Sequence, residues 1–119
     1  MNENPFRVSR FRALGDAFRG VKFVLREEPN SIPYAVLTIG IIALGFYRQV
    51  GRYDWAILFL AGGLLWGLEA LNTAVERLAD AVTLEHNPMI GKAKDIAAGA
   101  VQIGAAFALV AVVLVFVPK

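Results

Sequence analysis

Apolar residues fall into three long runs along this chain, at residues 34–47, 55–66 and 96–118. The third run reads IAAGAVQIGAAFALVAVVLVFVP and is long enough by itself to cross a bilayer, which needs about 20 residues. The first run is short for a span, and the second continues into a segment with a mixed polar and apolar pattern. We therefore expect an all-α membrane protein with three transmembrane helices, at residues 32–48, 54–82 and 92–117.

A fourth segment, residues 6–28, has an amphipathic pattern instead of a continuous apolar run. Its apolar residues recur at steps of three to five, and basic residues fill much of the remainder. This pattern favours a helix that lies in the membrane interface with its arginines near anionic headgroups. A helix that packs on the core of a soluble domain is the alternative. The apolar positions are Phe6, Phe11, Leu14, Phe18, Val21 and Leu25.

Composition supports the membrane interpretation. The chain has 119 residues, of which 57% are hydrophobic, whereas about 45–50% is usual for a soluble domain. Its mean hydropathy is +0.56. We therefore expect one small integral membrane domain over residues 1–119, with the bilayer as its surroundings and no nucleic-acid partner. The absence of cysteine excludes disulfides and thiol chemistry.

The basic residues are divided unequally between the two ends of the expected spans, which predicts the orientation. We expect the N-terminal helix and the segment 77–95 to lie in the cytoplasm, because three spans place them on the same side. That side carries Arg7, Arg10, Arg12, Arg19, Lys22, Arg26, Arg77, Lys92 and Lys94, whereas the other side carries Arg48, Arg52 and Lys119.

The second span contains a polar face where lipid is expected. In GLEALNTAVERLAD, residues 67–80, the polar side chains share one helix face about 100° wide. We expect Glu69 to lie deepest, just inside the apolar boundary, where an ionised carboxylate costs about 2.5–3.5 kcal/mol on insertion scales. The residues on this face are Glu69, Asn72, Thr73, Glu76 and Asp80, and those opposite are Ala70, Leu71, Ala74 and Leu78.

This set of side chains suits phosphoryl chemistry. Carboxylate and amide oxygens are ligands that Mg²⁺ prefers, usually together with nucleotide phosphates. A carboxylate at the lipid boundary can also act as a general base on a hydroxyl there. We expect GKAKD, residues 91–95, to open the third helix, where Lys92 and Lys94 suit phosphates.

Three other interpretations of the polar face stay open at this stage. It could be the water-exposed end of a helix in a bundle, or a proton relay in a membrane subunit. A silent scaffold that trimerises through its Gly- and Ala-rich helices is the third. Small residues such as Gly99 and Gly104 favour close helix approach. We expect Trp55 to be an interfacial anchor and Trp66 a packing residue.

The motifs ExxNTAxExxxD and AKDxAAGAV, with REEPN before the first span, resemble those of the small prokaryotic diacylglycerol kinase family. That family includes diacylglycerol kinases and undecaprenol kinases, and the resemblance covers nearly the whole chain. It implies an N-terminal interfacial helix, three spans and a homotrimer with active sites between subunits. It also implies transfer of the γ-phosphoryl group of ATP to a lipid hydroxyl, at the cytoplasmic surface of a bacterial plasma membrane.

The resemblance implies roles for individual residues. Glu69 would be the general base, and Asn72 would position groups around it. Glu76 and Glu28 would hold Mg²⁺ on the nucleotide phosphates. The residues expected to contact ATP are Arg10, Glu28, Glu76, Asp80, Glu85, Lys94 and Asp95.

Some positions depart from the family pattern. Ser9 stands where an arginine is common, Asp16 where an aromatic residue is common, and His86 lies one position from the usual histidine. Ala98, expected to contact the lipid, stands where diacylglycerol kinases tend to have serine. This favours undecaprenol as substrate and a role in carrier-lipid recycling, with diacylglycerol as the alternative.

Overall fold

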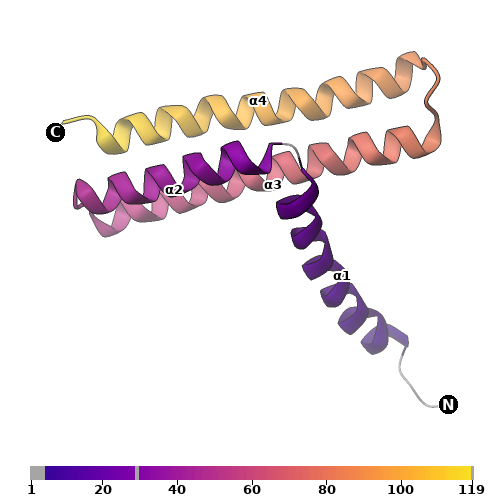
Figure 1. The fold of residues 1–119 in the computed structure, drawn as a ribbon, viewed down its shortest axis with the longest axis horizontal. Helices are drawn as coiled ribbons and strands as arrows, with labels where there is room; N and C mark the ends of the chain where they lie inside the picture. The colour runs from indigo at the N-terminus through magenta and orange to yellow at the C-terminus, as the bar shows by residue number, and fades with distance from the viewer. Residues whose placement is uncertain (1–4, 29, 119) are drawn as a thin grey trace. The chain divides into compact units, whose positions relative to one another are not determined.

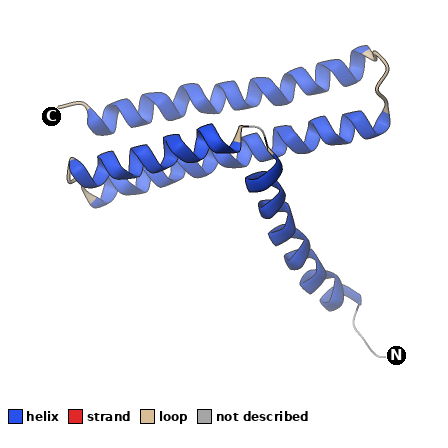
Figure 2. Ribbon diagram, in the orientation of Figure 1, coloured by secondary structure: helices blue, strands red, loops and turns tan. Residues whose placement is uncertain are grey.

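The computed structural model describes residues 5–28 and 30–118, and all of its regular structure is helical. It has four helices: α1 at Pro5–Glu27, α2 at Ser31–Tyr47, α3 at Arg52–Val82 and α4 at Pro88–Phe116 (Figure 1). No strand occurs among these residues (Figure 2). The all-α class predicted from the hydropathy pattern is confirmed.

Helices α3 and α4 are long and apolar enough to cross a membrane. A third span is counted only if Ser9–Glu27 and Ser31–Tyr47 together form one broken span. Helix α2 has 17 residues, which gives it a length of about 26 Å at 1.5 Å per residue, shorter than a hydrocarbon core of about 30 Å. Two of the three expected spans thus correspond to helices that are long and apolar enough to cross a membrane, and the first stays a prediction.

The start of α4 differs from the expectation. The helix begins at Pro88, whereas the span was expected from residue 92 and GKAKD was expected to open the helix. Asn87 is the N-cap, and its Oδ1 accepts hydrogen bonds from the amides of Met89 at 3.0 Å and Ile90 at 3.3 Å. Proline suits the first helical position because its missing N–H needs no partner there.

The chain divides into two units, with the boundary between Val36 and Leu37. In the first unit, the described apolar side chains of α1 are mostly exposed, including Phe11 at 68% and Phe18 at 72%. Asp16, one of the departures from the family pattern, forms an ion pair with Arg19 one turn later. The helix is confirmed, and its position in the membrane interface stays a prediction.

A buried serine stabilises the turn after α1. Ser31 is 5% exposed, and its hydroxyl donates to the carbonyl of Leu25 at 3.1 Å. Its backbone amide donates to the carbonyl of Glu28 at 3.1 Å. These bonds satisfy backbone acceptors near the end of α1 that have no partner within the helix.

In the second unit, α3 and α4 pack side by side and run antiparallel (Figure 1). Gly104 of α4 meets the side chain of Leu68 of α3, so a Cβ at residue 104 would overlap Leu68 Cδ1. The expected close approach at Gly104 is therefore confirmed, whereas a Cβ at Gly99 would meet nothing within 4 Å in this chain. Many large apolar side chains stay exposed, such as Leu60 at 75% and Phe107 at 73%. An apolar surface of this extent suits lipid or partner subunits.

Helix α2 is joined to α3 by a tight turn with an aromatic cluster. The Trp55 ring lies 4.8 Å from that of Phe46 and 5.8 Å from that of Phe59, between ring centroids. Gly45 is buried beneath Trp55, since a Cβ at residue 45 would lie 2.6 Å from Trp55 Cη2. Trp55 therefore packs on its own helical hairpin in addition to any contact with the interface.

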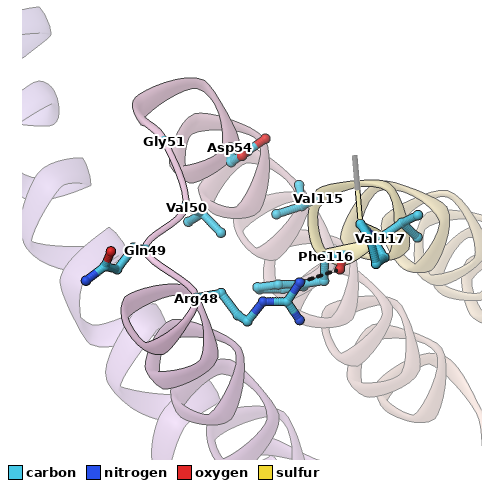
Figure 3. A pocket seen from close by; sticks show the side chains of 9 residues that line it. Arg48, Gln49, Val50, Gly51, Asp54, Val115, Phe116 and Val117 are labelled. Atoms are coloured by element: carbon cyan, nitrogen blue, oxygen red, sulfur yellow. Dashed lines mark hydrogen bonds between the residues drawn. The ribbon is translucent and has the colours of Figure 1, made fainter.

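The same turn contacts the end of α4 and borders a pocket of about 310 Å³ (Figure 3). The Arg48 guanidinium points toward α4 and donates to the carbonyl of Phe116 at 3.2 Å. This carbonyl is among the last of α4, which lack partners within the helix. The hydrogen bond of Arg48 therefore connects the turn between α2 and α3 to the C-terminal end of α4.

We predict that Gly45→Ala lowers the free energy of unfolding by about 1–3 kcal/mol, because Trp55 or α2 must shift to admit the methyl group. Thermal unfolding in detergent, followed by circular dichroism, measures this change. The matched control is Gly40→Ala on the same helix, where a Cβ meets nothing within 4 Å. The control should be neutral or stabilising by up to about 1 kcal/mol through helix propensity. Equal stability of the two variants would contradict the packing argument.

Candidate functional site

The predicted polar face of α3 points into the second unit at Glu69 and reaches solvent further along the helix. Glu69 is 3% exposed, whereas Leu71 and Leu78 on the opposite face are 65% and 68% exposed. Asn72 is partly buried, and Glu76 and Asp80 are exposed. Burial within this chain therefore decreases from Glu69 through Asn72 to Glu76 and Asp80, whereas the depth of these residues in the membrane stays a prediction.

Two features of the Glu69 turn bear on its chemistry. Thr73 Oγ1 donates to the backbone carbonyl of Glu69 at 3.1 Å, a common use of threonine inside a helix. Asn72 Oδ1 is buried and accepts no hydrogen bond from the residues that the structure describes. A buried acceptor without a donor costs about 1–3 kcal/mol, so a ligand with a hydroxyl or amino group could be bound there favourably.

At the exposed end of the polar face, the structure brings Asp80 and Lys94 together. The Lys94 Nζ donates to Asp80 Oδ1 at 3.2 Å, and this pair connects α3 to α4. The side chains are 39% and 55% exposed, respectively. Asp95 is exposed beside Lys94 on α4, and Glu85 is exposed in the loop between the two helices. Four residues expected near the nucleotide therefore belong to one end of the α3–α4 hairpin.

The structure changes the expectation that the start of α4 forms a phosphate site. Lys92 and Lys94 lie in the second turn of the helix, because the helix begins at Pro88. Two of the N-terminal amides already donate to Asn87 Oδ1. These two backbone amides are thus already bonded, and the lysine side chains are the groups near the start of α4 that can bind an anion.

The remaining predicted site residues are distributed over both units. Glu28 is partly buried directly after α1, and Arg10 is exposed on α1, both in the first unit. Ala98 is exposed on α4 in the second unit. The departures Ser9 and His86 are both exposed, on α1 and in the loop before α4.

Within residues 5–28 and 30–118, no three side chains of His, Cys, Asp or Glu are placed to hold a metal ion together. The predicted Mg²⁺ set contains two protein carboxylates, Glu28 and Glu76, and Mg²⁺ usually takes its other ligands from phosphates and water. The donor chemistry fits a nucleotide-bound Mg²⁺. The ion itself stays a prediction.

One contact near the polar face was not expected. The indole N–H of Trp66, predicted to be a packing residue, donates to Thr38 Oγ1 on α2 at 3.0 Å. Thr38 is a hydroxyl in the otherwise apolar stretch 35–46. That isolated hydroxyl was the available signal for an interhelical hydrogen bond.

Comparison with known proteins decides between the interpretations left open by the sequence. The sequence profile of the prokaryotic diacylglycerol kinases matches residues 15–116. The chain belongs to this family. As a member of a lipid kinase family, it is an enzyme that uses ATP, and the proton-relay and scaffold interpretations are set aside.

Individual members of the prokaryotic diacylglycerol kinase family are similar over most of their length. An undecaprenol kinase of Bacillus subtilis is 36% identical over 109 residues, which cover 92% of this chain and 89% of the relative. A diacylglycerol kinase of Helicobacter pylori is 31% identical over 97 residues, 82% of this chain and 76% of the relative. A diacylglycerol kinase of Pseudomonas aeruginosa is 28% identical over 105 residues, 84% of this chain and 85% of the relative.

We predict that Asp80→Asn changes the free energy of unfolding by less than about 1 kcal/mol, because ion pairs this exposed contribute little to stability. Any change should shrink as ionic strength rises, since salt screens exposed charges. Unfolding measured at low and high salt tests both statements. A large loss of stability that is independent of salt would show that the pair with Lys94 has a structural role.

Proposed function

We propose that this kinase transfers the γ-phosphoryl group of ATP to the hydroxyl of undecaprenol. The observation that carries the proposal is a carboxylate, Glu69, buried at 3% exposure in a helix apolar enough to span a membrane. A water-soluble acceptor would not require a base on a helix that can span a membrane, whereas a lipid alcohol keeps its hydroxyl at the membrane. The undecaprenol kinase among the relatives, at 36% identity, supports this acceptor.

Glu69 is the proposed general base. Its carboxylate takes the proton from the lipid hydroxyl as the hydroxyl oxygen forms a bond to the γ-phosphorus and the bond to ADP breaks. The buried Asn72 Oδ1 lies three residues further along α3 and accepts no hydrogen bond from the residues that the structure describes. We assign Asn72 the role of positioning the groups around Glu69. Burial excludes water, which would otherwise compete with the lipid hydroxyl for the phosphoryl group.

The exposed end of the hairpin is the proposed nucleotide site. Lys94 would exchange Asp80 for ATP phosphates, while Glu85 and Asp95 would contact the nucleotide. Arg10 would reach it from α1. Glu76 and Glu28 would hold Mg²⁺, which when bound neutralises charge on the phosphates.

The assembly and orientation are also proposals. We propose a homotrimer, supported by the large exposed apolar surface of α3 and α4 and by the family resemblance. We place the N-terminus and the α3–α4 loop in the cytoplasm, where ATP is available and where the basic residues concentrate.

Diacylglycerol is the second candidate acceptor. Relatives named diacylglycerol kinase are up to 31% identical over 82% of this chain. Ala98, exposed on α4 where such kinases tend to have serine, favours undecaprenol.

The decisive experiment is transfer of γ-³²P from Mg·ATP in lipid vesicles that contain the purified protein, with undecaprenol and diacylglycerol offered separately. We expect label mainly on undecaprenol. Glu69→Gln should lower kcat by about 10²–10⁴-fold, because a positioned base contributes about that much. Label mainly on diacylglycerol would be consistent with the proposed mechanism but would contradict undecaprenol as the acceptor. Normal turnover by Glu69→Gln would overturn the assignment of the base.

The metal assignment has a separate test. We predict that Glu76→Gln raises the Mg²⁺ concentration needed for half-maximal activity about tenfold or more, because it removes one of few protein ligands. Magnesium titrations at fixed ATP measure this, with Asp54→Asn, at the opposite end of α3, as the control. An unchanged magnesium dependence in Glu76→Gln would contradict its role.

A further inference from the structure

The turn of α3 that carries Glu69 is held by neighbouring helices on two sides. Three residues before Glu69, the Trp66 indole N–H donates to Thr38 Oγ1 on α2 at 3.0 Å. One residue before Glu69, Leu68 fits against Gly104 of α4, where no Cβ intervenes. All of these residues belong to the second unit, residues 37–119.

The two contacts restrict different motions of α3. The contact between Leu68 and Gly104 sets how closely α3 and α4 approach, but Leu68 Cδ1 is the end of a flexible side chain. The bond between Trp66 and Thr38 is directional, since a hydrogen bond weakens steeply when donor and acceptor lose alignment. It therefore restricts rotation of α3 about its own axis. The bond is partly buried, so a donor or acceptor that loses its partner there is poorly compensated by water.

Rotation of α3 matters because it decides where the Glu69 carboxylate points. Trp66 and Glu69 are separated by about 60° around the helix and about 4.5 Å along it, so a rigid helical turn couples their directions. A rotation of about 10° moves a group at the helix rim, about 6 Å from the axis, by about 1 Å. A displacement of about 1 Å can cost a reaction about 10²-fold in rate.

We propose that Thr38 and Trp66 are positioning residues for phosphoryl transfer. Their hydrogen bond fixes the rotation of α3 and thereby aims Glu69 at the lipid hydroxyl. Neither residue touches the reacting atoms. The inference rests on the proposed role of Glu69 as the base.

The test removes each partner of the hydrogen bond in turn. Thr38→Val removes the acceptor, Trp66→Phe removes the donor, and Thr38→Ser keeps the hydroxyl as the matched control. In the reconstituted transfer assay, we expect Thr38→Val and Trp66→Phe to lower kcat about 10–100-fold. The KM for Mg·ATP should stay within about twofold, and Thr38→Ser should restore most of kcat. The double variant should be no slower than the slower single variant, because both remove the same bond.

Other outcomes overturn the proposal. Wild-type kcat in Thr38→Val would show that the bond does not aim the base, and equal losses in Thr38→Val and Thr38→Ser would show that the hydroxyl is not responsible. A loss of kcat that parallels a loss of folded protein, measured by thermal unfolding in the same vesicles, would make the bond merely structural. These failures are distinguishable from failure of the proposed function, in which the wild-type protein would label neither lipid.

Discussion

A carboxylate buried in a helix that is apolar enough to cross a membrane is the constraint on which the rest of this structure depends. Glu69 is 3% exposed, and an ionised group in such surroundings is unfavourable unless neighbouring elements supply a hydrogen-bonding or charged partner. The enclosing helices must approach closely, which explains why Gly104 faces the turn that carries Glu69. The same requirement places Leu71 and Leu78 on the outward face, where lipid can surround them.

The length of α3 allows one helix to serve both lipid and nucleotide. Its 31 residues extend about 46 Å, which exceeds a hydrocarbon core of about 30 Å. If Trp55 marks one edge of that core, Glu69 lies about 21 Å into it and Asp80 about 37 Å along the helix, beyond the far edge. Buried and exposed acidic residues on a single face therefore suit the proposed base within the membrane-spanning part of α3 and the proposed nucleotide contacts beyond it.

Much of this site could be predicted from the sequence, because periodicity determines which residues share a helix face. The spacing of Glu69, Asn72, Glu76 and Asp80 was enough to predict that they share one helix face. The expected start of α4, at the charged segment 91–95, lies C-terminal to the actual start. Asn87 followed by Pro88 is the helix-start signal in the sequence. The isolated Thr38 hydroxyl indicates an interhelical hydrogen bond, but Trp66 as its partner could not be predicted, since that depends on the register between α2 and α3. Periodicity in the sequence predicts which residues share a helix face, but not which neighbouring helix packs against that face.

The two ends of the polar face differ in how firmly their groups are held, and this difference suits their proposed roles. Lys94 and Asp80 form an exposed pair at 3.2 Å, which contributes little to stability and can be exchanged. ATP phosphates carry more negative charge than one carboxylate, so they compete favourably for Lys94. A nucleotide must enter and leave in every turnover, and an exchangeable pair permits this. The base must meet each lipid hydroxyl in the same geometry, and contacts from both α2 and α4 hold the turn on which it lies.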